Sequence, residues 1–211
     1  MNITIFGASG KTGQLLVRKA LSQGHMVMAY VRRKDSIELE DPNLKIIVGK
    51  LDESDKLKEA IQGADACIST LGGSSLRKRS IEVTEGISRI ISLMEELEVS
   101  RFVYLSSIGA GESRYFMPGF TRFLVCDVFL RIPLADHSLN EENLKKSTLN
   151  YTIVRPGGLT EGDETANLKF GSEKIMLKGN PKISRADVAS FMLEHCSDTR
   201  FGKSAVWLHE A

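Results

Sequence analysis

Short apolar runs alternate with amphipathic stretches along most of this chain. The apolar runs predict strands at residues 3–6, 25–31, 44–48, 66–71, 101–106, 151–154 and 205–208. The stretches with apolar positions at helical spacing predict helices at residues 14–21, 54–62, 81–97, 138–146 and 185–195. Strands that alternate with helices are typical of βαβ units, which build a parallel sheet. We therefore predict an α/β fold, a doubly wound parallel sheet with flanking helices.

One segment, at about residues 112–135, departs from this alternation. It crowds together large apolar side chains, namely Phe116, Phe120, Phe123, Leu124, Val128, Phe129 and Leu130. Two interpretations are open. In the first, the segment is exposed and forms a lid over a hydrophobic substrate or a dimer surface. In the second, it packs back on the core.

Composition narrows the class of protein. The chain has 211 residues, of which 42% are hydrophobic and 26% charged, which predicts one globular domain over residues 1–211. A formal net charge of +1 gives no basic field, so we expect neither a nucleic acid nor a membrane partner.

Cysteine and histidine usage adds two expectations. Cys67, Cys126 and Cys196 are widely separated, which predicts reduced thiols, and the four histidines lack convergent ligands, so we expect no metal. The chain enters a strand at once and has no long apolar window, from which we expect a cytoplasmic protein. Its oligomeric state is left open between a monomer and a homodimer.

The first predicted strand runs into a turn with three glycines, Gly7, Gly10 and Gly13. Glycine lets the backbone turn sharply, approach a pyrophosphate without a Cβ in the way, and pack the following helix close to the strand. Free N–H groups at the start of that helix bind phosphate. We therefore predict a cradle for the phosphates of a dinucleotide.

The polar residues of the same turn belong to this cradle. They are Ser9, Lys11 and Thr12. The run Gly10-Lys11-Thr12 also resembles the end of a nucleoside-triphosphate P-loop, but that motif requires a glycine where this chain has Ile5. The dinucleotide interpretation is therefore favoured.

Arg32 and Arg33 follow the second predicted strand, at the place where dinucleotide-binding proteins select their cofactor. An acidic residue there would bind a ribose 2′-hydroxyl, whereas arginine accommodates a 2′-phosphate. The hypothesis is therefore NADP(H), and a solvated basic turn is the alternative. A second basic run at residues 77–79 stays unassigned between a phosphate contact and a solvated turn.

In a doubly wound sheet the ligand crosses the carboxyl ends of the strands. The residues that follow the fourth, fifth and sixth core strands are therefore candidates for the site: Leu71, Gly72, Ser106, Ser107, Pro156 and Gly157. The glycines allow close approach of the backbone to a flat ligand, although glycine and proline are also common in ordinary turns.

Taken together, these motifs resemble the atypical short-chain dehydrogenase/reductase superfamily, in its NAD(P)H-binding, NmrA-like branch that includes biliverdin/flavin reductase. The resemblance runs nearly end to end and lies in residues 7–13, 31–32, 71–72, 102–107, 151–159 and 183–189. It implies a Rossmann-like core with the nicotinamide near Ser106, Ser107, Pro156 and Gly157. It also implies that Leu51 and Asp52 flank the adenine, although Lys50 stands where many relatives have an acidic residue.

The chain departs from typical members of this superfamily in its catalytic residues. Those enzymes use a tyrosine and a lysine four residues later on one helix face, where this chain has His137 and Glu141. The resemblance then implies hydride transfer from NADPH to a flavin, a quinone or a similar planar acceptor. Our hypothesis is that Ser107 orients the acceptor or the nicotinamide and that His137 donates a proton, because the ordinary histidine pKa of about 6.5 suits transfer around neutral pH. A surface role for His137 is the alternative for that residue. For the whole protein, the alternative is an NmrA-like sensor or scaffold that binds the dinucleotide without turnover.

Overall fold

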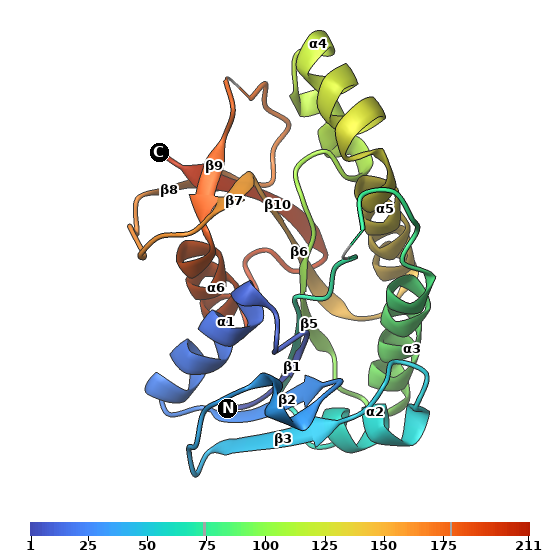
Figure 1. Ribbon diagram of the computed structural model, residues 1–211, viewed down its shortest axis with the longest axis vertical. Helices are drawn as coiled ribbons and strands as arrows, with labels where there is room; N and C mark the ends of the chain where they lie inside the picture. The colour runs from blue at the N-terminus through green and yellow to red at the C-terminus, as the bar shows by residue number, and fades with distance from the viewer. Residues whose placement is uncertain (74, 178) are drawn as a thin grey trace.

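The computed structural model describes residues 1–73, 75–177 and 179–211, and its centre is a sheet of eight strands (Figure 1). Their order is β3-β2-β1-β4-β5-β6-β10-β8. The strands comprise β1 Asn2–Phe6, β2 Met26–Val31, β3 Leu44–Val48, β4 Ala66–Ser69, β5 Arg101–Leu105, β6 Asn150–Pro156, β8 Leu168–Gly171 and β10 Ser204–Glu210. All neighbours pair in parallel except β8, which runs antiparallel to β10 at the edge. The predicted doubly wound α/β fold is thus confirmed.

Helices cover both faces of this sheet (Figure 1). Helices α1 (Lys11–Ser22) and α6 (Arg185–Glu194) pack together on one face. The opposite face carries α2 (Ser54–Ile61), α3 (Ile81–Glu96) and α5 (Arg131–Lys146). Each face has its own cluster of buried apolar side chains, because both sides of the central strands are apolar and buried.

The strand order reverses between β1 and β4, which positions the site. From β1 the chain passes outward to β2 and β3, then returns to place β4 on the other side of β1. The connections therefore diverge at the carboxyl ends of β1 and β4, and a crevice forms there.

Residues 111–130 form an arm of short helices that projects beyond the end of the sheet (Figure 1). It contains a 3₁₀ helix η2 (Gly111–Phe116), α4 (Gly119–Arg122) and a π-helical stretch η3 (Phe123–Phe129). One side is buried and anchors the arm, through Phe116, Met117 and Cys126. The other side is open, with Phe120 76% exposed and Phe129 64% exposed. Part of the segment therefore packs on the core, and a large apolar face remains exposed.

Several predicted boundaries are wrong. Helix α5 begins at Arg131 rather than at residue 138, so His137 lies in its second turn and not at its start. Two short strands, β7 (Gly158–Thr160) and β9 (Lys182–Ser184), form a separate parallel pair, and with the edge strand β8 they were not expected. Within the described residues, the structure contains no helix that is both long enough and apolar enough to span a membrane.

Candidate functional site

The turn between β1 and α1 has the geometry that a pyrophosphate requires. Gly7 adopts a φ of +79°, in the left-handed region. A Cβ on Gly13 would lie 2.9 Å from the Cα of Ala8 and closer still to the carbonyl oxygen of Gly7, so only glycine fits. Helix α1 begins after Gly10, and none of the described side chains caps its first N–H groups. These groups and the positive end of the helix dipole suit an anion, so the turn fits a dinucleotide's phosphates.

A pocket of about 470 Å³ opens beside this turn, at the carboxyl ends of β1, β2 and β4. We call it the cofactor cleft. Of the residues predicted from the sequence, seven line it: Gly7, Ser9, Gly10, Arg32, Leu51, Leu71 and Gly72. Its volume lies within the usual range for a small-molecule site. The structure therefore brings residues from four separate loops to one cleft.

Tyr30 also lines the cofactor cleft, and sequence reasoning missed it. Its hydroxyl donates a hydrogen bond of 2.7 Å to the carbonyl oxygen of Lys50, which ties the end of β2 to the loop after β3. Burial, with a further effect of the nearby carboxylates Glu53 and Asp52, raises the pKa of Tyr30 to about 12. The side chain is therefore a neutral wall of the cleft. Its place at the end of a core strand was the signal that could have found it.

Other lining residues were also missed. Thr70 follows β4, and the residues at positions 79–83 span the end of the loop and the first turn of α3. These positions could have been expected from the same rule, because α3 starts at the end of the loop that follows β4.

The predicted arginines lie together on a second hollow, of about 790 Å³, that borders the glycine turn. Arg32 and Arg33 share its lining with Ser9, Gly10 and neighbouring polar side chains. Arg32 also lines the cofactor cleft, so the two spaces meet at this side chain. This arrangement places two cations beside the phosphate cradle.

Not every predicted contact lies in the cleft. The ammonium of Lys11 is 2.8 Å from Glu161 and points to that carboxylate at the surface. Thr12 and Gly13 are buried in the first turn of α1, where they support the cradle by packing. Asp52 is exposed and is not among the lining residues of the cofactor cleft, whereas its neighbour Leu51 is.

The candidate residues after β4, β5 and β6 lie side by side along one edge of the sheet, because these three strands are consecutive parallel neighbours. Ser107 follows β5, and its hydroxyl donates to the carbonyl oxygen of Ile108 at 3.1 Å. Gly157 follows β6, and a Cβ there would lie 2.5 Å from the carbonyl oxygen of Pro181. The lining of the cofactor cleft includes Leu71 and Gly72 after β4, but within the described residues it does not extend to Ser106, Ser107, Pro156 or Gly157.

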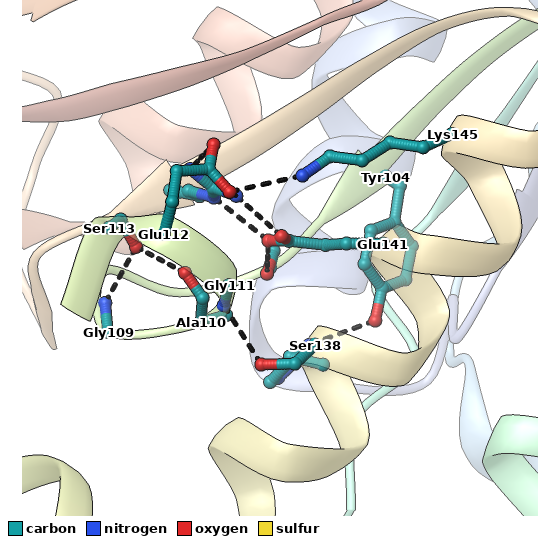
Figure 2. Close-up of polar contacts among 12 residues, drawn as sticks. Tyr104, Gly109, Ala110, Gly111, Glu112, Ser113, Ser138, Glu141 and Lys145 are labelled. Carbon is teal, nitrogen blue, oxygen red and sulfur yellow. Dashed lines mark hydrogen bonds and ion pairs between the residues drawn. The ribbon is translucent and has the colours of Figure 1, made fainter. Parts of the chain in front are cut away.

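A buried ion-pair network lies at the ends of β5 and β6, and its glutamates are drawn in Figure 2. Arg155 donates to Glu141 through Nε at 2.9 Å and through Nη2 at 2.5 Å. It also donates to Glu112 at 2.9 and 3.0 Å, and Lys145 approaches that same carboxylate at 3.1 Å. Ser106 donates its hydroxyl proton to Glu141 at 2.6 Å. The network therefore fixes Ser106 where the resemblance places the nicotinamide.

The sequence did not reveal this network. Glu141 occupies the position where typical superfamily members have a lysine, and Arg155 lies in an apolar strand. The guanidinium of Arg155 within an apolar strand was the signal for a buried partner of opposite charge.

A second polar cluster joins β5 to α5. The hydroxyl of Tyr104 lies 2.9 Å from Nδ1 of His137, and Asn140 donates to the same hydroxyl at 2.9 Å. Burial lowers the pKa of His137 and raises that of Tyr104, so both side chains are neutral at pH 7. With Nδ1 engaged by Tyr104, Nε2 is the nitrogen of His137 that can act on a ligand.

A glycine-rich β1–α1 turn, a cleft at the switch point and basic residues after β2 together define an NAD(P)-binding protein of the Rossmann type. The comparison with family models agrees with this class. Residues 7–199 match the model described as NAD(P)H-binding, and the chain belongs to this family.

Individual relatives and structures support the same conclusion. An uncharacterized chloroplast protein of Arabidopsis thaliana is 32% identical over 203 residues, which cover 91% of this chain and 70% of that protein. A short-chain dehydrogenase/reductase from Veillonella parvula, solved in complex with NADP, has a TM-score of 0.84 at 21% identity and covers 99% of this chain and 94% of its own. ChuY, an anaerobillin reductase from Escherichia coli O157:H7, has a TM-score of 0.81 at 24% identity, with coverage of 100% and 97%. The resemblance to atypical short-chain dehydrogenase/reductases is thus confirmed.

Proposed function

We propose that this protein is an NADPH-dependent reductase that transfers hydride to a flavin, a quinone or a similar planar acceptor. The observation that carries the proposal is the pair Arg32 and Arg33 on a hollow that borders both the phosphate cradle and the cofactor cleft. Guanidinium groups bind a phosphate with charge-assisted hydrogen bonds, so this pair suits the 2′-phosphate of NADPH.

The residues around β5 and α5 favour a planar acceptor over a simple carbonyl compound. His137 and Glu141 replace the tyrosine and lysine of the usual proton relay, and both are held in internal contacts. When bound, NADPH supplies a hydride, and the acceptor gains this hydride and one proton to reach its two-electron-reduced form. The chain's part is then to orient the acceptor, which we assign to Ser107, and to deliver the proton, which we assign to Nε2 of His137.

Removing the first arginine should weaken NADPH binding selectively. We expect Arg32→Ala to raise the Kd for NADPH about tenfold or more and to change the Kd for NADH less than about twofold, because only NADPH carries the 2′-phosphate. Lys34→Ala is the matched control, since Lys34 is also basic and close in sequence but does not line either space. Titration calorimetry of the wild type and the two variants measures the Kd for each cofactor. A wild-type protein that binds NADH more tightly than NADPH would contradict the proposal.

The role of His137 should appear as a pH dependence. Its pKa lies below the ordinary 6.5, so the imidazolium that donates a proton is present only in the acidic range and is lost as the pH rises. We expect His137→Gln to lower kcat about tenfold at pH 5.5 and much less at pH 7.5. An unchanged kcat at both pH values would end the proposed proton donation and leave His137 a structural residue.

One experiment separates a reductase from a cofactor sensor. NADPH oxidation is followed by absorbance with FMN, riboflavin and several quinones, after calorimetry has shown that NADPH binds. Turnover above the protein-free rate supports the reductase. Tight binding without turnover contradicts it and favours the sensor or scaffold, which the internal engagement of His137 and Glu141 would also suit.

A further inference from the structure

The arm of residues 111–130 exposes a group of large apolar side chains where it projects beyond the sheet (Figure 1). Five of its side chains are more than half exposed, namely Tyr115, Phe120, Phe123, Val128 and Phe129. Leu76, in the loop before α3, is also more than half exposed and lines the same hollow as Val128. A folded protein rarely leaves so many large apolar side chains on one short element, so the arm is a candidate interaction surface.

Both carboxylates of the arm are already paired. Glu112 forms ion pairs with Arg155 at 2.9 Å and with Lys145 at 3.1 Å. Asp127 is paired with Arg114 at 2.8 Å. The arm therefore presents no unpaired negative charge to a partner.

Three arginines on or beside the arm have no such pairing. Arg122 belongs to α4, Arg131 begins α5, and Arg77 lies in the loop before α3. None of the three forms an ion pair with a residue that the structure describes. Arg77 and Arg131 line one hollow with Val128, and the guanidinium of Arg122 lies 5.3 Å from the ring centroid of Tyr115. Unpaired positive charge therefore lies directly beside the exposed apolar side chains.

We infer that the arm docks on an anionic lipid surface, with its phenylalanines in the headgroup layer and its arginines on the lipid phosphates. Basic side chains beside exposed aromatic and aliphatic ones are typical of segments that lie in the membrane interface. An anionic surface strengthens binding about fivefold for each basic residue near it. Within the described residues the arm contributes nothing to the lining of the cofactor cleft, so the inference is independent of the reductase function.

Charge and shape favour lipid over a protein as the occupant. A two-fold dimer through the arm would bring two sets of unpaired arginines together without a carboxylate to balance them. A stable interface with another protein buries about 800 Å² on each side. The arm instead presents a few short helices that project from the body of the molecule (Figure 1). Insertion into a headgroup layer needs no matching surface, so a projecting arm suits it.

This inference departs from the expectation that the net charge gave. The formal charge of +1 is a sum over the whole chain and says nothing about where the charges lie. On other elements exposed charges balance each other, as Lys58 and Glu96 do at 2.7 Å. At the arm they do not, and this local excess becomes visible only when the loop before α3 is placed beside the start of α5.

Cosedimentation with vesicles tests the docking. One set of vesicles contains phosphatidylcholine alone, and the other contains phosphatidylcholine and phosphatidylglycerol in equal parts. We expect the protein to bind the anionic vesicles at least about tenfold more tightly than the neutral ones. This binding should weaken as the salt concentration rises, because salt screens exposed charges.

A double variant assigns the charge dependence to the arm. Arg122→Ala/Arg131→Ala should weaken binding to the anionic vesicles about tenfold and leave binding to the neutral ones unchanged. Arg18→Ala is the matched control, because Arg18 is an exposed arginine on α1, away from the arm (Figure 1). An unchanged midpoint of thermal unfolding shows that each variant is folded.

Insertion of the apolar side chains is measured separately. Phe120→Trp places an indole in α4, and the chain's own Trp207 is buried. The emission of this variant should shift to shorter wavelength with anionic vesicles, because the indole leaves water. Met26→Trp is the control, since Met26 is also exposed but lies at the start of β2 and should show no shift. Phe120→Ser/Phe129→Ser should weaken vesicle binding about tenfold or more.

Each outcome decides the inference. Binding that needs both the arginines and the phenylalanines, together with the emission shift, supports it. Binding to neither kind of vesicle, or binding that the arm variants leave unchanged, overturns it. Binding without an emission shift shows adsorption by charge alone and overturns the insertion of the phenylalanines. A dimer in solution that Phe120→Ser/Phe129→Ser converts to a monomer shows that a second copy covers this face, and it also overturns the inference.

Discussion

Replacement of Arg155 by methionine is expected to lower the free energy of unfolding by about 3–5 kcal/mol at neutral pH. The side chain of Arg155 is 2% exposed, and its partner Glu141 is 1% exposed. Methionine fills much of the same space, but it leaves the carboxylate of Glu141 buried with only the hydroxyl of Ser106 as a hydrogen-bond donor from the network. An unpaired charge in a dry interior is far more costly than the loss of a surface contact. Urea denaturation at pH 7.5 measures the change.

Two further variants show whether burial of the charge causes this loss. In the double variant Glu141→Leu/Arg155→Met no charge is left buried, so we expect it to regain at least half of the lost stability. Arg200→Met removes a guanidinium from an exposed pair with Asp198 and should cost less than about 1 kcal/mol. A double variant as unstable as the single one would show that packing, and not charge, dominates at this site.

The other ion pair of Arg155, with Glu112, makes part of the stability depend on pH. Hydrogen bonds from Arg155 lower the pKa of Glu112 from 4.5 to about 2. Because the folded-state pKa is the lower one, the carboxylate stabilises the fold above pH 4.5, and this contribution is lost as the pH falls from 4.5 toward 2. Glu112 is 46% exposed, so solvent screening keeps the contribution small. In Arg155→Met, stability should therefore fall less steeply through this range than in the wild type.

The order of the core elements could be predicted from the sequence because the central strands are buried on both faces. β1, β4 and β5 are short runs of apolar residues, and polar, amphipathic stretches separate them. Strands that lack this pattern were missed. β8 and β9 are short, and neither contains a long apolar run; β8 lies largely exposed at the edge of the main sheet, and β9 pairs with β7 outside it.

The start of α5 was missed for a reason of local chemistry. Pro133 lies in the first turn of the helix, where a missing N–H costs nothing because that group has no intrahelical partner. The periodic pattern becomes clear only later in the helix. The π-helical stretch that precedes it has no simple period in the sequence at all.

The candidate site likewise has one part that could be predicted from the sequence and one part that could not. The cradle of Gly7, Gly10 and Gly13 could be predicted because it depends on residues close together in one turn. The ion pairs of Arg155 with Glu141 and of Arg79 with Asp136 could not, because they join elements that are distant in the sequence. Such contacts depend on how the arm and α5 lie against the sheet, which hydrophobic periodicity does not determine.

A methyl group at Gly13 should abolish useful cofactor binding, although alanine is the better helix former. By helix propensity alone, Gly13→Ala in α1 would stabilise the protein by up to about 1 kcal/mol. Its Cβ, however, would collide with the carbonyl oxygen of Gly7 and lie 2.9 Å from the Cα of Ala8. Both are backbone atoms of the turn itself, so the turn must open to admit the methyl group. We therefore expect the NADPH Kd to rise about 100-fold or more, which corresponds to about 2.7 kcal/mol.

The sign of the change in the free energy of unfolding shows whether the collision or the helix propensity of alanine dominates in Gly13→Ala. We expect Gly13→Ala to lower the free energy of unfolding by about 1–3 kcal/mol, as overpacking does. Gly162→Ala is the matched control, because its Cβ would find no atom nearer than 4.0 Å, and it should leave both the Kd and the stability unchanged. Calorimetric titration with NADPH and urea denaturation of both variants measure the two effects. A Gly13→Ala protein that is more stable and binds NADPH normally would show that the turn accommodates a side chain, and that the phosphates are bound elsewhere. Because a sensor and a reductase both need the cradle, this result tests the cofactor site whatever the protein does with the cofactor.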